Sequence, residues 1–323
     1  MWNHSLSLLA RARQRATLAA LVPVLALACN RQAPAPPVAP WSPRAEQRAR
    51  HRVRQAAVTI RFSNGSLQPG AAESATDRLQ VAAVFGDIDR RDMGVFAGLV
   101  GQTPQEIIPA LDSCVRQARL YHQLGDVPAS PPAAYMQLLD VGNVQLHAAA
   151  NELPLRVRMV PSLFDAVRGV RYDADLDMGR PWLAAGSLHV TATGGDGVAA
   201  FDAEVPVPRP VRLTHVGREV VRNGRVQGPQ VLSDLSLRWG SVDGTAELEL
   251  QLGTEQVGAL GWLRCRVRDD GEFVIPAAFI EQLPTRSPSV TWLALLARTR
   301  RAAVPGFEDK PLRLEVTDSA YVQ

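Results

Sequence analysis

Residues 246–252 read AELELQL and residues 263–267 read LRCRV, and this alternation of apolar and polar residues decides the fold. Successive side chains of a β-strand point to opposite faces, so each stretch predicts a strand with one apolar face and one wet face. Regular alternation predicts a mainly β chain, an antiparallel β-sandwich of the immunoglobulin-like or jelly-roll-like kind. The same pattern recurs at residues 144–148, 155–159, 188–192, 235–239 and 312–316.

The pairing of the two quoted strands can be predicted from parity. A short loop directly after Leu252 would pair Leu252 with Val257 and Ala246 with Leu263, all on one face of the hairpin. In that register Cys265 points into the core.

The sequence before residue 133 contains both strand-like and helix-like patterns. Residues 58–62 alternate like a half-buried strand, whereas residues 79–85 are apolar on both parities and predict a strand buried on both faces. Asp89 is placed to cap a short helix, and a second helix is expected from residues 110 to 124. The domain prediction is therefore a small mixed α/β region at 55–132, packed on a β-sandwich domain at 133–323.

The first 28 residues have the parts of an export signal: three arginines, an apolar run from Thr17 to Ala28, and then Cys29. The run is too short to span a bilayer of ~30 Å. The stretch resembles a bacterial lipoprotein signal, which implies cleavage after Ala28 and lipid on the Cys29 sulfur. The alternatives are a secretory signal with a chance cysteine and an N-terminal membrane helix. Because Asn30 is not an aspartate, the resemblance favours the outer membrane, facing the periplasm or the cell surface.

Residues 29–54 predict a Pro/Arg-rich tether without a core of its own. Residues 32–43 read QAPAPPVAPWSP, typical of an extended spacer. Six arginines against Glu46 give the segment a formal charge of +5. The segment either contacts anionic lipid head groups or is a solvated arm. No nucleic-acid partner is expected, because no aromatic residues are interleaved with the arginines to stack on bases.

If Cys29 is lipidated, Cys114 and Cys265 are the remaining cysteines of the three. An exported protein meets an oxidising compartment, where the two sulfurs can form a disulfide. Two buried free thiols are the alternative, since unpaired cysteine packs like a small hydrophobe.

No stretch matches a catalytic or cofactor-binding motif, so the sequence predicts no cofactor and no enzyme activity. Asp173, Asp175 and Asp177 are spaced like the start of a calcium loop, but Met178 and Ala184 stand where such a loop needs glycine and glutamate. The interpretation is a solvated acidic turn, with calcium as the alternative.

Asp269, Asp270 and Gly271 predict a hairpin turn, with a metal site again as the alternative. The six histidines are too scattered in the sequence for a zinc site. His147 and His189 fall on wet faces, and His215 shares the parity of buried neighbours. The four tryptophans of the β region are expected in the core, with a sugar-stacking platform as the alternative: Trp182, Trp239, Trp262 and Trp292.

A broader resemblance covers roughly residues 80–320. The order of a strand ending at Trp239, a strand of alternating leucines and the run CRVRDDGEFVIPA at 265–277 resembles a group of lipoproteins from delta-proteobacteria such as myxobacteria. These also share a lipidation signal, a proline-rich linker and a strand like Asp140–Asn143. The resemblance implies a β-sandwich in the periplasm or at the cell surface, and it implies no activity.

These observations lead to two hypotheses about function. The first is a non-catalytic lipoprotein, held on the membrane by its lipid, that binds an envelope protein or polysaccharide or has a structural role. The alternative is a hydrolase of envelope polysaccharide or peptidoglycan with carboxylates on the sandwich loops, since such carboxylates leave no local signature.

Overall fold

Residues Arg48–Gln323 form one compact unit. The predicted signal peptide, Cys29 and most of the tether lie outside the residues that the structure, a computed structural model, describes. Those residues are 52–63, 78–102, 109–117, 136–160, 167–177, 179–226, 234–253, 262–281, 283, 292–307 and 311–322.

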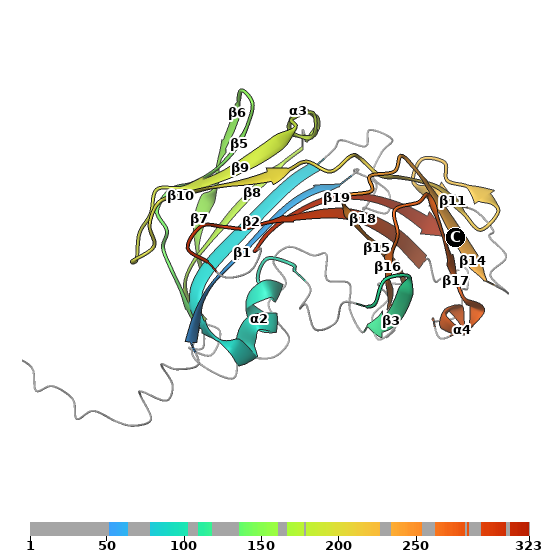
Figure 1. The fold of residues 1–323 in the computed structure, drawn as a ribbon, viewed down its shortest axis with the longest axis horizontal. Coiled ribbons are helices and arrows are strands. Elements are labelled where there is room, and N and C mark those ends of the chain that lie inside the picture. Colours follow the sequence, from blue (N-terminus) through green and yellow to red (C-terminus); the bar gives the residue numbers. More distant parts are fainter. Residues whose placement is uncertain are drawn as a thin grey trace, which may run out of the picture. The chain divides into compact units, whose positions relative to one another are not determined.

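One large sheet forms the base of the unit (Figure 1). It has ten strands, and in spatial order the path runs β16 (Trp262–Val267), β15 (Glu247–Gly253), β18 (Trp292–Ala302), β19 (Leu312–Val322), β1 (Arg52–Ser63), β2 (Arg78–Asp89), β4 (Met136–Leu138), β8 (Val167–Leu176) and β7 (Arg156–Val160). The tenth strand, β13 (Arg225–Val226), pairs with β19 off this path.

Two four-stranded sheets accompany the large one. The first small sheet has the order β10 (Phe201–Pro206), β9 (Ser187–Ala192), β5 (Val144–Ala148) and β6 (Asn151–Pro154). The second small sheet has the order β12 (Glu219–Val220), β11 (Arg212–Val216), β14 (Leu235–Gly240) and β17 (Glu272–Ile275).

Helices are short in the described part of the chain: η2 (Arg90–Asp92), α2 (Met93–Gly98), α3 (Arg180–Leu183) and α4 (Ala277–Ile280). Among the described residues, none of these helices has the length and apolar character to cross a membrane.

Strand β19 shows that both small sheets cover the same face of the large sheet. Its residues Leu312 and Leu314 belong to the core under the first small sheet. Further along, Ala320 and Val322 belong to the core under the second small sheet. All four have even numbers and therefore point to one face of the strand. The unit is thus two β-sandwiches side by side that share one large sheet, which confirms the predicted mainly β sandwich class.

The opposite face of the large sheet is covered in part by α2. Odd residues of β1 and even residues of β2 pack there with Phe96 of α2, as Ala57, Ala82 and Val84 do. The predicted cap is present: the Asp89 carboxylate accepts a hydrogen bond from the backbone N–H of Arg91 at 3.0 Å. The short helix after it lies where the sequence placed it.

The tether and the predicted mixed region differ from the sequence predictions. Strand β1 begins at Arg52, so it takes in the last residues of the predicted tether. Strands β1 and β2 lie in the middle of the large sheet, and β1 pairs in parallel with β19 from the far end of the chain. Residues 55–132 are therefore not a separate region packed on the sandwich. Local periodicity identifies a strand but not the distant strand beside it.

The predicted pairing of β15 with β16 is wrong in register and right in face. Leu252 pairs with Leu263 and Leu250 with Cys265, so the connection is longer than the four residues assumed. A slip by an even number of residues keeps every side chain on its face. Cys265 is therefore still fully buried in the core of the second sandwich, as predicted.

Part of the predicted second helix is a strand instead. Residues Ser113–Gln117 form β3, and Leu111 just before it makes a parallel bridge to Arg266 of β16. Contact with β16 at the edge of the large sheet overrides the predicted helix here: the Asp112 N–H donates to the carbonyl of Arg266 at 2.7 Å. The rest of the predicted helix, from residue 118, lies outside the described residues.

Candidate functional site

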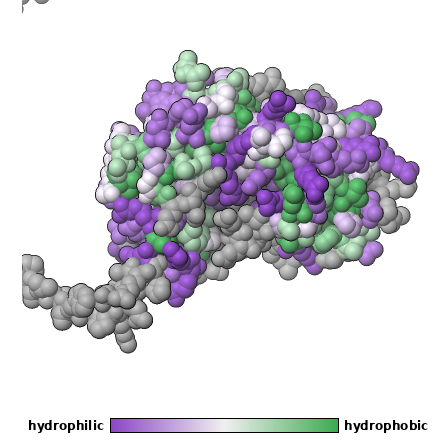
Figure 2. All heavy atoms as spheres, in the orientation of Figure 1, coloured by the Kyte–Doolittle hydropathy of each residue, from purple (hydrophilic) through white to green (hydrophobic). Residues whose placement is uncertain are grey.

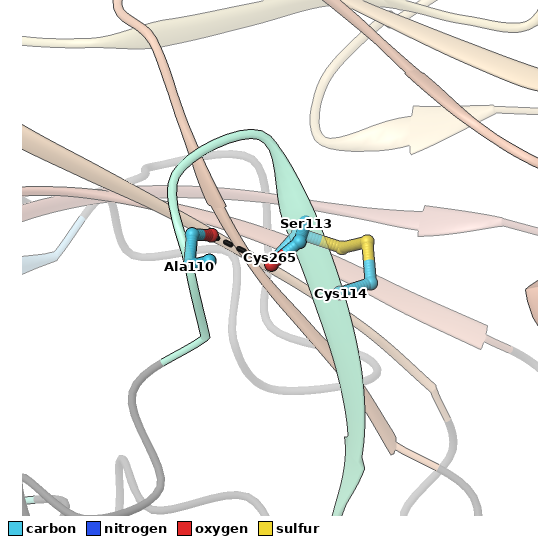
Figure 3. Close-up of a disulfide and its surroundings, with 4 residues drawn as sticks. All are labelled: Ala110, Ser113, Cys114 and Cys265. Atoms are coloured by element: carbon cyan, nitrogen blue, oxygen red, sulfur yellow. Dashed lines mark hydrogen bonds between the residues drawn. A yellow bond between two sulfur atoms is a disulfide. The ribbon is translucent and has the colours of Figure 1, made fainter.

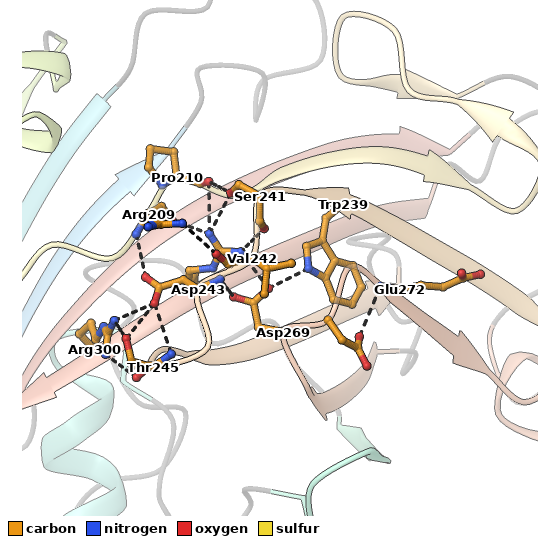
Figure 4. Close-up of polar contacts among 12 residues, drawn as sticks. Arg209, Pro210, Trp239, Ser241, Val242, Asp243, Thr245, Asp269, Glu272 and Arg300 are labelled. Carbon is orange, nitrogen blue, oxygen red and sulfur yellow. Dashed lines mark hydrogen bonds and ion pairs between the residues drawn. The ribbon is translucent and has the colours of Figure 1, made fainter.

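The most deeply buried ion pair of the described residues joins the large sheet to the second small sheet (Figure 4). Arg298 lies on β18, and Asp269 lies in the turn between β16 and β17. The Arg298 Nη2 donates to Asp269 Oδ1 at 2.9 Å, and the two side chains are 0% and 2% exposed. We call this pair and the donors and acceptors around it the Asp269–Arg298 cluster.

Arg298 also donates hydrogen bonds to backbone carbonyls. Its Nη1 donates to the carbonyl of Arg209 at 2.7 Å, and its Nη2 donates to the carbonyl of Ser241 at 2.7 Å. These carbonyls belong to the segments that enter β11 and leave β14. Because β11 and β14 are antiparallel and Arg212 pairs with Gly240, both segments lie at one end of the second small sheet, and one arginine of the large sheet fixes that end.

Both carboxylate oxygens of Asp269 accept hydrogen bonds from other segments. Its Oδ1 also accepts from the indole Nε1 of Trp239 at 2.9 Å, and its Oδ2 accepts from the backbone N–H of Asp243 at 2.7 Å. Gly271 follows at a φ of 102°, as the predicted turn requires. Because donors from three segments contact the two carboxylate oxygens, the geometry holds these segments together.

Asp243 forms the second ion pair of the cluster. Its Oδ1 accepts from Arg300 Nη2 at 2.8 Å, and its Oδ2 accepts from the backbone N–H of Arg209 at 3.0 Å. Burial alone raises the pKa of the Asp243 carboxyl, but the hydrogen bonds from Arg209 and Thr245 and the charge of Arg300 outweigh it. Together they lower its pKa from 3.8 to about 2.

This shift predicts a pH dependence of stability. A carboxyl whose folded pKa lies below its unfolded pKa contributes stability that is complete above the unfolded value, near 3.8, and is lost as the pH falls through about 2. In chemical unfolding between about pH 5 and pH 2, Asp243→Asn should lose less stability on acidification than the wild type. The exposed neighbour Asp270→Asn serves as the control. Equal pH slopes for Asp243→Asn and wild type would contradict the assignment.

An open cavity of about 380 Å³ lies beside the cluster. Its walls come from the start of β15, the end of β16, the following turn and the segment before β3, and include Glu247, Arg266, Arg268, Asp270 and Leu111. Arg268 pairs with Asp112 at 2.9 Å, and Arg266 lies 3.8 Å from Glu247. A space of this size accepts a small ligand or one side chain of a partner, and its walls carry both charges.

A second group of ion pairs lies on the face of the large sheet that points away from the two small sheets. We call this the charged face. Arg61 of β1 pairs with Glu315 of β19 at 2.9 Å, and Arg264 of β16 pairs with Glu249 of β15 at 2.6 Å. Arg313 of β19 contacts both glutamates. All but Glu249 are at most 3% exposed. The prediction that this face of the strands is wet is therefore wrong here, because the charges are buried and paired.

Burial shifts the pKa values of arginines on the charged face. It lowers the pKa of Arg301, and the nearby positive charge of Arg313 lowers it further. Burial also acts to lower the pKa of Arg313, but Glu315, Glu249 and Glu247 outweigh it and raise that pKa. Buried pairs of this kind cost desolvation free energy that the attraction only roughly offsets, so they specify strand pairing more than they add stability.

The predicted acidic turn at Asp173–Asp177 is mostly strand. Asp173 and Asp175 lie in β8, where Asp173 pairs with Arg158 at 2.7 Å and Asp175 pairs with Arg78. Asp177 follows the strand and is exposed. The structure does not bring these acids to Asp269 or Asp270 in a shared ion-pair network. Within the described residues, no group of three or more His, Cys, Asp or Glu side chains could hold a metal ion.

His215 does not follow its predicted parity. A bulge between Leu213 and His215 shifts the pairing of β11 with β14, so His215 is only partly buried and lies 3.2 Å from the Thr214 hydroxyl. The four tryptophans are core residues, each at most 5% exposed, as expected: Trp182, Trp239, Trp262 and Trp292.

Cys114 and Cys265 are joined by a disulfide that ties β3 to β16 (Figure 3). This is the first of the two alternatives that the sequence left open. Beside it, the Ser113 hydroxyl donates to the carbonyl of Ala110 at 2.7 Å and closes the turn before β3. The bridge links residues 151 positions apart.

The sequence analysis did not predict a group of buried hydrogen bonds in the first sandwich. The buried Tyr172 donates to Asp140 Oδ1 at 2.7 Å and accepts from the backbone N–H of Val141. Burial and this bond to Asp140 raise the pKa of Tyr172. Gly142 has a φ of 78°, and a Cβ there would lie 2.2 Å from the Thr193 hydroxyl. Asp140–Asn143 is thus a tight turn before β5, not a strand, and the D-x-G spacing was the available signal.

No family model and no curated protein matches the sequence. Among solved structures, the chain is similar to a Ca²⁺-stabilized adhesin that helps an Antarctic bacterium bind ice, with 8% sequence identity and a TM-score of 0.18. The similarity covers 83% of this chain and 49% of that chain, so this chain spans about half the length of the adhesin chain.

Proposed function

We propose that the chain is a lipid-anchored protein of the bacterial cell envelope whose paired sandwiches act as a non-catalytic binding module. In this proposal the signal at residues 1–28 is removed, Cys29 carries the lipid, and the tether at 29–54 holds the sandwiches away from the outer membrane. The partner is an envelope protein or polysaccharide.

The observation that carries the proposal is the sorting of the three cysteines. Cys114 and Cys265 are used by one disulfide, which is typical of an oxidising compartment outside the cytoplasm. Cys29, the remaining cysteine, stands at the position that a lipoprotein signal requires. An export signal, an oxidised pair and a single cysteine behind an apolar run are mutually consistent.

The ion pairing of the described aspartates supports the binding role. Asp173, Asp175 and Asp269 all pair with arginines. The surface in Figure 2 mixes hydrophilic and hydrophobic residues. Large exposed apolar side chains come from several separate elements: Leu111, Val157, Met159, Val220, Val242 and Val274. The proposed partner surface is therefore of mixed polarity like the rest of the surface, as in most non-obligate interfaces.

The test of the anchor is Cys29→Ser in a bacterial host with its own lipoprotein processing. The variant should leave the washed membrane fraction and lose the acyl mass on its N-terminal peptide, because a serine hydroxyl cannot form the thioether. Several acyl chains, contributing about 0.8 kcal/mol per buried CH₂, otherwise hold the protein on the membrane.

The matched control is Gln32→Ala, which alters the tether three residues later and keeps the sulfur. It should stay in the membrane fraction with its lipid. If Cys29→Ser also stays in washed membranes and its N-terminal mass is unchanged, the lipoprotein proposal is wrong.

A further inference from the structure

The outer faces of the two small sheets carry opposite charges, and the face of the first small sheet is acidic. On β10 buried inner residues alternate with exposed outer ones, which puts Asp202 and Glu204 on the outer face. Register places a row across this face, from β10 to β6: Glu204, His189, His147 and Glu152. The four strands contain these three acids and no lysine or arginine, so their formal charge is −3 with neutral histidines.

The outer face of the second small sheet is basic. Arg212 and Arg238 each adjoin a buried core residue of their own strand and therefore point outward. Arg222 points the same way, because its neighbour Val221 packs against the core. Arg238 pairs with Glu272 at 3.2 Å, and both side chains are about half exposed. The four strands and the segment 217–226 contain five arginines and two glutamates, a formal charge of +3: Arg212, Arg218, Arg222, Arg225, Arg238, Glu219 and Glu272.

The two faces cannot neutralise each other within one molecule. Both small sheets cover the same face of the large sheet, so both outer faces point away from it (Figure 1). The first small sheet packs on β1, β2 and β8, whereas the second packs on β15, β16 and β18, toward the other end of the strand order. The charge complement of each face is therefore found on another copy of the chain.

From this juxtaposition we propose that the module binds a second copy of this chain, with the acidic face of one copy against the basic face of the next. A second copy engages both faces, whereas an anionic polysaccharide would engage only the basic one. Charge complementarity of this kind steers the encounter of two molecules and sets their orientation. Because the two faces are unlike, the contact is heterologous, and its repetition builds rings or filaments.

This inference names a partner for the binding role proposed above, but the contact itself needs no lipid. A shared membrane anchor would add to it by raising the effective concentration of the copies. A lipidated protein that does not self-associate would contradict this inference and leave the anchor standing. Self-association of a chain that carries no lipid would contradict the anchor and leave this inference standing.

The experiment is sedimentation equilibrium of the purified full chain in a non-ionic detergent matched to the density of the buffer, so that only protein mass is measured. At about 0.01 M salt, where the Debye length is about 30 Å, wild type should sediment as more than one chain. At about 1 M salt, where that length is about 3 Å, it should sediment as a single chain. Reversing the charge of either face should weaken the association at least about tenfold, because attraction becomes repulsion. The acidic-face variant is Glu152→Arg with Glu204→Arg, and the basic-face variant is Arg212→Glu with Arg222→Glu.

Mixing the two variants is the sharpest measurement. The reversed acidic face of one is complementary to the reversed basic face of the other, so an equimolar mixture should recover the association that each variant lacks alone. Recovery also shows that both variants are folded. The matched control, Asp177→Arg with Glu281→Arg, makes the same change in net charge as the acidic-face variant, at exposed acids outside both small sheets. It should associate like wild type.

The inference is overturned if wild type is a single chain at low salt, if either face variant associates as tightly as wild type, or if their mixture stays single. It is also overturned if the control loses association as the face variants do, since net charge alone would then explain the effect. A wild type that stays single and binds dextran sulfate, while the basic-face variant does not, would assign the basic face to an anionic polysaccharide instead.

Discussion

Replacing Arg298 with methionine is expected to lower the free energy of unfolding by about 3–5 kcal/mol. Methionine fills much of the same volume, so the loss comes from charge and hydrogen bonding. It leaves the Asp269 carboxylate buried without its cation and leaves the carbonyls of Arg209 and Ser241 without their donor. A buried charge that loses its partner keeps the whole cost of having left water.

The measurement is unfolding in urea or guanidinium, with midpoint and slope fitted for wild type and variant. The matched control is Arg238→Met on β14, whose partner Glu272 lies at 3.2 Å and whose side chain is 55% exposed. Loss of that exposed pair should cost about 0–1 kcal/mol. An Arg298→Met variant no less stable than Arg238→Met would show that the cluster does not hold the two sheets together.

A double variant checks that the two buried groups act as a pair. Adding Asp269→Asn to Arg298→Met removes the stranded charge, so the combined loss should be smaller than the sum of the two single losses. Additive losses would mean that Asp269 and Arg298 stabilise the protein through separate partners.

Removing the disulfide is expected to lower the free energy of unfolding by on the order of 5 kcal/mol. The bridge spans 151 residues, and the entropy of closing so long a loop in the unfolded chain gives that estimate. The loop contains the first small sheet and all of the second small sheet except β17. The expected result is a lower denaturation midpoint for Cys114→Ala combined with Cys265→Ala, and the same midpoint for wild type unfolded under reducing conditions.

The neighbouring Ser113→Ala variant is the control, because it removes only the hydrogen bond to Ala110 and should cost about 1 kcal/mol or less. Alkylation before reduction should label neither Cys114 nor Cys265. Two labelled thiols, or a cysteine-free variant as stable as oxidised wild type, would contradict the predicted contribution of the bridge.

The sequence predicted well wherever a residue's face depends only on its own strand. Alternation identified β5, β9 and β14 of the small sheets and β7, β15, β16 and β19 of the large sheet. It also placed Cys265 in the core even though the predicted pairing with β15 was displaced. Parity has a period of two, so it survives any even slip in register. The Asp89 cap was equally local, since its donor is two residues away.

The candidate sites could not be predicted in this way, because each depends on pairing between distant strands. Asp269 looked like a turn residue, and nothing near it in the sequence indicates Arg298, which lies 29 residues later on β18. His147 and His189 are 42 residues apart, and only the antiparallel register of β5 with β9 brings them face to face. His215 shows the converse, since a bulge that parity cannot foresee moved it.

The sequence by itself therefore determined the class of the fold, the face of most strands and the positions of the short cap and turns, since neighbours along the chain set these. The tertiary structure alone decided that β1 lies beside β19, that one sheet serves two sandwiches, and that Arg61 and Glu315 are buried together. The physical reason is that alternation predicts solvent exposure for any arginine or glutamate on the polar face of a strand. Only the arrangement of distant segments removes that face from water.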